Sequence, residues 1–394
     1  MTTSYRNIFL LACCQGLLLT NASGLISMNA LVGFSLTDVK TLATLGATTY
    51  VLGSALATMP MSLWMGKVGR RRGFMTGALI NIAGCGIAVL ALSLKSFPLY
   101  CVGTAVIGVY NAIGLQYRFA AAEVAAPKDR ARAISLVLAG GIGGGFLGPA
   151  ITRWGREIFD APFLGSFALL AAVALVALAV QSQVRVPKPS LAEQTDAGRP
   201  LASIARQPVF IVAAIAATLG YGLMNLLMTA TPLAMDLCSL PYAQAAYVIS
   251  WHVVGMYAPG FFTGSLIDRF GILQVILAGV AILAAGAGVA LMGNAYEHFL
   301  VALTLVGVGW NFMYTGGTTL LTQSYTPSEK SRTQGLNDFI MFSTMTVSTF
   351  SSGALVANGG WHLMNAIALP ILAFVACVVL WYLRHRRRHA AAAA

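Results

Sequence analysis

The sequence predicts an all-α integral membrane protein of twelve transmembrane helices, arranged as two six-helix repeats of parallel topology. Three observations lead to this fold class. The 394 residues are 58% apolar and only 9% charged, with a mean hydropathy of +0.77, whereas soluble proteins carry roughly 25% charged residues. The apolar residues fall into runs long enough to cross a bilayer. Short motifs also recur about 200 residues apart.

Each predicted span is a run of about 20 or more mainly apolar residues, the length that a helix needs to cross the hydrocarbon core. The twelve runs are 7–33, 38–64, 73–94, 97–121, 131–152, 162–183, 208–234, 241–265, 271–292, 297–322, 333–356 and 362–383. The first run is too long for the apolar region of a signal peptide and lacks a clear cleavage site. We therefore expect it to be retained as the first helix.

One long polar stretch divides the chain. Residues 185–207 contain three prolines and several charges, and they follow the sixth run. The sequence therefore predicts an N-terminal six-helix bundle over 1–184, a cytoplasmic linker over 185–207, and a C-terminal six-helix bundle over 208–394 that ends in a basic cytoplasmic tail.

The charges predict the orientation. The chain has 24 Lys and Arg against 12 Asp and Glu, a net charge of +12. If the connection between the second and third spans is cytoplasmic, 19 of the 24 basic residues lie on that side, and Lys40, Lys95, Arg153 and Arg156 lie on the other. Lys and Arg mark the cytoplasmic side of membrane proteins. We expect a monomer in the bacterial cytoplasmic (inner) membrane with both termini cytoplasmic. The basic residues form no nucleic-acid groove, so we expect no nucleic-acid partner.

Two motifs support the repeat. Lys67-Val68-Gly69-Arg70 recurs as Arg269-Phe270-Gly271 at an offset of 202 residues, and Pro127-x4-Arg132 recurs as Pro327-x4-Arg332 at an offset of 200. Parallel repeats with a substrate site between them are typical of one class of secondary transporter.

The segment from Gly264 to Gly271, Gly-Ser-Leu-Ile-Asp-Arg-Phe-Gly, resembles the G-x-x-x-D-R-x-G loop of the major facilitator superfamily. In that family the loop's carboxylate helps to latch the cytoplasmic side shut, which implies a gating role for Asp268 and Arg269. The first copy, over residues 62–72, has Gly66 in place of the acidic residue and Ser62 in place of the first glycine. The first half therefore lacks the loop carboxylate that would form this latch.

Charged residues inside spans are functional candidates because the bilayer makes them expensive. Three qualify: Arg118 and Glu123 near the end of the fourth span, and Asp338 in the eleventh. We interpret them as candidates for proton coupling or gating. The competing interpretation makes Glu123 an interfacial partner of Arg130 or Arg132 and lets Asp338 reach the cytoplasmic surface.

Of the five histidines, only His252 lies well inside a predicted span, because His298 and His362 lie at the ends of theirs and the other two belong to the basic tail. Met256 follows His252 by one helical turn. On the preceding span, Met224 and Met228 have the same spacing. Thioether and imidazole ligands suit Cu(I). Met pairs also fill cores, so the pairs alone are weak signals. We predict a ladder in which Met228 receives the ion, Met224 with His252 holds it, and Met256 passes it on.

This pattern, together with the segment 116–123 and Ala133-Ile134-Ser135, resembles the CcoA-type copper importers of the superfamily, a subfamily that also includes riboflavin transporters. The resemblance implies import of copper, as Cu(I), by alternating access for cuproenzymes such as cytochrome oxidase. Copper is then the transported substrate, and no cofactor is expected. Cys238 is a candidate thiol where the ion would enter.

The alternative is import of riboflavin or another small organic solute. Aromatic side chains would then stack on the solute and amides would hydrogen-bond to it. The candidates that would line the cavity are Gln116, Tyr221, Trp251, Tyr257, Trp310, Asn311 and Tyr314. An enzyme is not expected, and there are no catalytic residues to name, because the sequence has none of the common catalytic spacings.

A glycine-rich run covers residues 140–148. It lies inside an apolar span with no strand before it, which excludes a phosphate-binding loop. Small residues at 140, 144 and 148 instead permit close packing against another helix.

Overall fold

The computed structural model describes residues 3–37, 42, 45–187 and 198–393. Parts of two predicted elements lie outside the described residues: 38–41 and 43–44 of the second span, with Lys40, and 188–197 of the linker. The described residues form helices and no strand. They cluster into two compact units, each of which we describe by itself.

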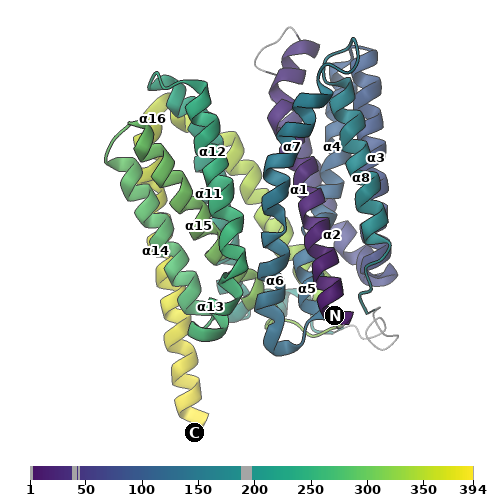
Figure 1. Cartoon of the computed structure of the whole chain (residues 1–394). Helices are drawn as coiled ribbons and strands as arrows, with labels where there is room; N and C mark the ends of the chain where they lie inside the picture. Colours follow the sequence, from purple (N-terminus) through teal and green to yellow (C-terminus); the bar gives the residue numbers. More distant parts are fainter. Residues whose placement is uncertain (1–2, 38–41, 43–44, 188–197, 394) are drawn as a thin grey trace. The chain divides into compact units, whose positions relative to one another are not determined.

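Unit 1 comprises Met1–Ala126, Leu136–Ala197 and Pro327–Phe342. Its helices are α1 (Thr3–Leu36), α2 (Leu45–Val68), α3 (Arg70–Ser93), α4 (Phe97–Gly114), α5 (Tyr117–Val124), α7 (Gly141–Gly155) and α8 (Leu164–Gln181), with the start of α16 (Lys330–Ala393) and the end of α6 (Arg130–Ala139). Helix α1 packs on α7 and α8, and α4 packs on α2 and α3 (Figure 1).

Unit 2 comprises Pro127–Ser135, Gly198–Thr326 and Ser343–Ala394. Its helices are α10 (Leu201–Ala205), α11 (Pro208–Leu237), α12 (Tyr242–Tyr257), the 3₁₀ turn η3 (Ala258–Phe261), α13 (Thr263–Phe270), α14 (Ile272–Leu291) and α15 (Tyr296–Leu321), together with the 3₁₀ turn η2 (Pro127–Asp129), the start of α6 and most of α16. Helix α15 is central, because it packs against α11, α12 and α14 (Figure 1).

The two units exchange one short segment each. Pro127–Ser135 belongs to the first repeat in sequence but clusters with unit 2, and Pro327–Phe342 belongs to the second repeat but clusters with unit 1. These are the segments that carry the repeated Pro-x4-Arg motif. The internal repeat therefore extends to these two segments, because each one clusters with the unit that the other repeat forms.

Backbone geometry also repeats. Gly69 has φ 89° and ψ 155°, Gly271 has φ 94° and ψ 154°, and each glycine immediately precedes a helix. Glycine adopts positive φ without the steric cost that a Cβ imposes. Both loop copies therefore keep this glycine because each makes the same turn, with a positive φ, immediately before a helix.

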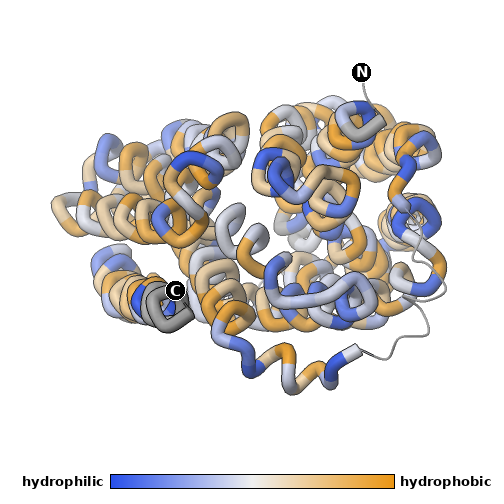
Figure 2. Tube along the Cα trace, turned by 90° about the horizontal axis from the view of Figure 1, so that it is seen from below, coloured by the Kyte–Doolittle hydropathy of each residue, from blue (hydrophilic) through white to orange (hydrophobic). Residues whose placement is uncertain are grey.

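Within the described residues, nine helices are long and apolar enough to cross a membrane. The other three predicted spans correspond to helices with local reasons for falling short. Helix α2 carries hydroxyl residues such as Ser54 and Thr58, η3 interrupts the segment that contains Pro259, and the first part of α16 carries polar residues such as Asn337 and Asp338. Figure 2 shows that apolar residues make up much of the trace, with hydrophilic residues interspersed.

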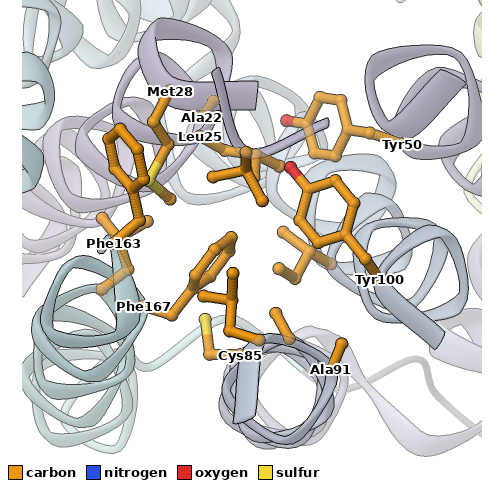
Figure 3. Close-up of a cluster of buried hydrophobic side chains, with 14 residues drawn as sticks. Ala22, Leu25, Met28, Tyr50, Cys85, Ala91, Tyr100, Phe163 and Phe167 are labelled. Atoms are coloured by element: carbon orange, nitrogen blue, oxygen red, sulfur yellow. The ribbon is translucent and has the colours of Figure 1, made fainter. Parts of the chain in front are cut away.

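The core of unit 1 contains a cluster of large side chains that includes Leu25, Tyr100 and Phe167 (Figure 3). The predicted glycine seam is also present, because a Cβ at Gly144 would lie 2.7 Å from the Thr20 backbone nitrogen on α1. The Ser23 hydroxyl donates to the Gly144 carbonyl at 2.9 Å. The glycine-rich run is therefore a helix-packing surface.

Candidate functional site

An aromatic cluster lies in unit 2, formed by Tyr221, Tyr257, Trp310 and Tyr314. Trp310 and Tyr314 are one turn apart on α15, and their rings stack with centroids 5.0 Å apart and an interplanar angle of 16°. Tyr221 on α11 meets both rings edge-on at 5.3 Å. Tyr257, at the end of α12, contacts Trp310 edge-on at 5.8 Å. Three helices therefore place aromatic rings around one indole.

Polar groups with unused hydrogen-bonding capacity lie on the same helices. Thr318 follows Tyr314 by one turn on α15, and Thr218 precedes Tyr221 by three residues on α11. The hydroxyls of Thr218 and Thr318, and the Trp310 Nε1–H, are buried and have no partner among the described residues. The same holds for the Thr315 hydroxyl. Buried polar groups are normally paired, so unpaired ones are unusual and mark a candidate ligand site.

His252 is buried on α12 and faces α15. Its Nδ1 lies 2.7 Å from the Leu303 carbonyl oxygen. A carbonyl can only accept, so we assign the proton to Nδ1, which leaves a lone pair on Nε2. The Nε2 atom is buried and unpaired within the described part of the chain. It can accept a hydrogen bond or bind a metal ion.

The methionines of the predicted ladder differ in their burial. Met224 and Met256 are buried, and Met228 is partly buried. Counted from the turn that joins α11 to α12, Met228 and His252 lie about 14 and 15 Å along their helices, while Met224 and Met256 lie about 20 and 21 Å along them. The sequence-based ladder placed Met224 level with His252. Counted from the observed helix ends, His252 is instead level with Met228, and Met256 is level with Met224, because α12 begins at Tyr242 and ends at Tyr257.

Asn311 is a structural brace. Its Nδ2 donates to the Met256 carbonyl at 2.7 Å, and its Oδ1 accepts from the Thr263 hydroxyl at 2.7 Å. These bonds secure the break at η3, where the helical ladder is interrupted and backbone groups need other partners. The amide that we expected to line a cavity is therefore committed to holding α12 and α13 on α15.

Three other predicted residues lie outside the aromatic cluster. Trp251 is 43% exposed, and its ring contacts Tyr247. Gln116 belongs to unit 1, where it accepts from Arg70. Cys238 caps the end of α11 as a free, partly exposed thiol.

Unit 1 contains a buried ion pair between Arg118 on α5 and Asp338 on α16. The Arg118 and Asp338 side chains are 1% and 0% exposed. Arg118 also donates to the Leu115 carbonyl at 2.6 Å, and its guanidinium lies over the Phe119 ring at 4.3 Å. The expectation that Asp338 could reach the surface is wrong, because its carboxylate is held by a charge from another helix.

A second ionic cluster lies nearby in unit 1. Arg70 at the start of α3 pairs with Glu123 at 2.7 Å, and Lys330 lies 3.5 Å from the same carboxylate. Arg70 also donates to Gln116 and Gln334. The interpretation of Glu123 as a partner of Arg130 or Arg132 is wrong. The chain reverses after α5, so Glu123 faces α3 and α16 while the arginines that follow it cluster with unit 2.

The loop at Asp268 forms an equivalent contact in unit 2. Asp268 pairs with Arg132 at 2.6 Å, and the Gly264 N–H donates to the Ser135 hydroxyl at 3.0 Å. A Cβ at Gly264 would lie 2.8 Å from the Ala131 carbonyl oxygen, so glycine is needed for this approach. Arg269 lies over the Phe270 ring at 5.2 Å.

Gly66 takes the place of this acid in unit 1. A Cβ there would lie 2.9 Å from the Ser331 Cβ, and the Ser62 hydroxyl donates to the Ser331 carbonyl at 2.6 Å. The first half therefore lacks the loop carboxylate and joins α16 through Glu123 and Arg70 instead.

Sequence reasoning missed the three unpaired threonines. For Thr318 a signal existed, because residues 310, 314 and 318 are spaced by four and therefore lie on the same side of α15; no such spacing singled out Thr218 or Thr315. It also missed Arg70, Lys330 and Gln334, because nothing local connects residues more than 200 positions apart.

The sequence matches the family described as Major Facilitator Superfamily over residues 8–256 and again over 213–394. It is 40% identical to the riboflavin transporter RfnT of Brucella anthropi, over 100% of this chain and 99% of the relative. It is 28% identical to the uncharacterized transporter YddS of Bacillus subtilis, over 91% and 86%. The fold is similar to that of the transporter FucP, a protein whose crystal structure is in the outward conformation, with a TM-score of 0.75 at 15% identity, covering 96% and 99% of the two chains.

Proposed function

The chain belongs to the major facilitator superfamily and is a multi-pass membrane transporter, and we propose that its substrate is riboflavin or a closely similar flavin, imported by alternating access. Members of this family are generally not enzymes. The riboflavin transporter of Brucella anthropi, which aligns with this chain over nearly its full length, supports a flavin as the substrate.

The aromatic cluster is the observation that carries the proposal. A flavin is a flat, uncharged tricyclic ring with a hydroxylated chain. Stacked Trp310 and Tyr314, with Tyr221 edge-on, offer the flat and edge contacts that aromatic ligands prefer. Pockets for small molecules combine such surfaces with a few placed polar groups.

The neighbouring polar groups fit an uncharged ligand. Thr218, Thr315 and Thr318 can donate or accept, the Trp310 Nε1–H can donate, and His252 Nε2 can accept. These partners match the carbonyls, ring N–H and hydroxyls of a flavin. A charged substrate would require an opposite charge, because a buried unpaired charge is costly.

Copper is the weaker reading. His252 Nε2 supports it, since that nitrogen offers a lone pair with its tautomer fixed by the Leu303 carbonyl. No group of three or more His, Cys, Asp or Glu residues that could hold a metal occurs in the described part of the chain. The full-length relative is named for riboflavin. The comparisons thus favour the alternative in our sequence analysis over its first choice.

The remaining sequence expectations enter as parts of the proposal. The transporter lies in the bacterial cytoplasmic membrane as a monomer, with both termini cytoplasmic, as the 19 to 4 distribution of basic residues favours. Arg118 and Asp338 couple transport to protons. The unpaired Asp338 Oδ2 supports this role because it has room for a proton. Asp268, Arg269 and Glu123 gate the transporter.

Uptake in cells tests the proposal. The chain is expressed in a riboflavin-requiring bacterium that lacks its own importer, and accumulation of labelled riboflavin is measured. We expect saturable uptake that Trp310→Leu lowers at least tenfold at limiting substrate, with Trp251→Leu as the matched control because Trp251 lies outside the cluster.

Copper accumulation in the same cells is the second arm. We expect no change on expression of the wild type or of His252→Ala. Copper accumulation that requires His252, without riboflavin uptake, would replace our proposal with the copper reading.

A further inference from the structure

A cavity of about 590 Å³ opens at one end of unit 2. Four parts of the chain line it: the segment 127–131, the end of α13 with the start of α14, the end of α15, and residues 383 and 386 of α16. All are connections or helix ends on the side that the charges predict to be cytoplasmic. The cavity is therefore placed at the level of the lipid headgroups and is separate from the aromatic cluster.

Three basic side chains line this cavity: Lys128, Arg130 and Arg386. The Nε of Arg130 is buried and has no hydrogen-bond partner among the described residues. Among the described residues of the lining, the one acidic residue, Asp268, forms an ion pair with Arg132 at 2.6 Å, so its charge is already balanced. The charges that line the cavity therefore favour an anion.

The backbone adds donors. Gly271, with φ 94°, immediately precedes α14, and residues 271–274 line the cavity. The N–H groups of the first turn have no acceptor within their own helix, and the positive end of a 20-residue helix favours negative charge. The Gln274 and Gln323 amides also line the cavity. Backbone and amide donors beside arginine are the partners that phosphate oxygens use.

Apolar side chains complete the lining, among them Ile267, Leu273 and Leu383. A basic pocket beside apolar helix ends matches a phosphate that is joined to a lipid.

We infer that this cavity binds a phosphate group, either the headgroup of an anionic phospholipid or a soluble phosphate. The inference does not depend on the transported substrate, because no residue of the aromatic cluster lines the cavity.

Native mass spectrometry of the delipidated full chain in detergent tests this inference. The protein is titrated with phosphatidylglycerol and, separately, with phosphatidylcholine of the same acyl chains. We expect one saturable, tighter phosphatidylglycerol site. Lys128→Gln, Arg130→Gln and Arg386→Gln should each weaken it about fivefold, which is the effect of one surface cation on an anionic lipid. Arg384→Gln is the matched control, because Arg384 lies on the same helix outside the cavity lining.

Competition with inorganic phosphate distinguishes the two sources. Displacement of phosphatidylglycerol by millimolar phosphate, lost in the same three variants, supports a soluble phosphate ligand. Failure of phosphate to compete, with the variant pattern intact, supports the lipid headgroup. Binding of equal strength in the wild type and in the triple variant, or no preference for phosphatidylglycerol, would overturn the inference. Equal thermal unfolding midpoints confirm that the variants are folded.

Discussion

The ion pair between Arg118 and Asp338 allows a quantitative prediction. Asp338→Asn keeps the shape of the side chain and an oxygen for the guanidinium, but it removes the negative charge. Arg118 is then a buried cation, 1% exposed, that still contacts the neutral Leu115 carbonyl and Phe119 ring but has lost the carboxylate that balanced its charge. Removing one partner of a buried pair costs roughly 3 to 5 kcal/mol. The Leu115 carbonyl and the Phe119 ring still stabilise the guanidinium, so we expect about 3 kcal/mol.

The converse variant is expected to cost less. In Arg118→Met the side-chain length is kept, and Asp338 is left without its counter-charge. A carboxylate can bind a proton and become neutral, whereas a guanidinium cannot lose one at ordinary pH. We therefore expect a loss of about 2 kcal/mol. The double variant removes both charges and should lose about 1 kcal/mol, because replacing a whole buried pair is often nearly neutral.

The free energy of unfolding of the purified protein in micelles, measured by denaturant titration, gives the double-mutant cycle. A coupling energy of about 4 kcal/mol between the two positions follows from these values. Single variants within about 0.5 kcal/mol of the wild type, or a double variant whose loss equals the sum of the singles, would refute the buried pair.

Three further predictions follow from single residues. Trp310→Leu should weaken flavin binding about tenfold in isothermal calorimetry, since an aromatic stack contributes about 1 to 3 kcal/mol, while Trp251→Leu should leave the affinity unchanged. Asn311→Ala should lower the free energy of unfolding by about 1 to 2 kcal/mol because the Met256 carbonyl loses its donor, while the Thr263 hydroxyl still donates to the Pro259 carbonyl at 2.8 Å; a loss below about 0.5 kcal/mol would contradict the brace at η3. Gly66→Asp should destabilise the protein by about 1 to 3 kcal/mol despite restoring the family's acid, because Ser331 occupies the space. Adding Ser331→Gly should recover part of that loss, and no recovery would argue against the clash.

The sequence predicted the helical membrane fold well, because apolar runs and positive connections report directly on the bilayer. It did not predict where every helix is interrupted. Pro259 was a local signal for the break at η3, because proline lacks the N–H that a helix needs, but the bond from Asn311 to the Met256 carbonyl, 55 positions away, could not be predicted from local pattern. The exchange of Pro327–Phe342 into unit 1 likewise depends on packing rather than on local pattern.

In the candidate sites, too, the sequence did not predict which distant residues come into contact. Arg118 and Asp338 stand out singly because charges are rare in spans, yet nothing in the sequence pairs residues 220 positions apart. Trp251 and Trp310 look equivalent in sequence. The structure separates them, since one is exposed and the other is enclosed by tyrosines. Glu123 was assigned to nearby arginines because proximity in sequence was the available guide.

The most direct test of the central claim is flavin exchange by the purified protein. The wild type is reconstituted into liposomes loaded with unlabelled riboflavin, and entry of labelled riboflavin by counterflow is followed. We predict saturable counterflow that is strongly reduced in Trp310→Leu and retained in Trp251→Leu. Absence of counterflow from active liposomes that instead accumulate Cu(I) would contradict the account.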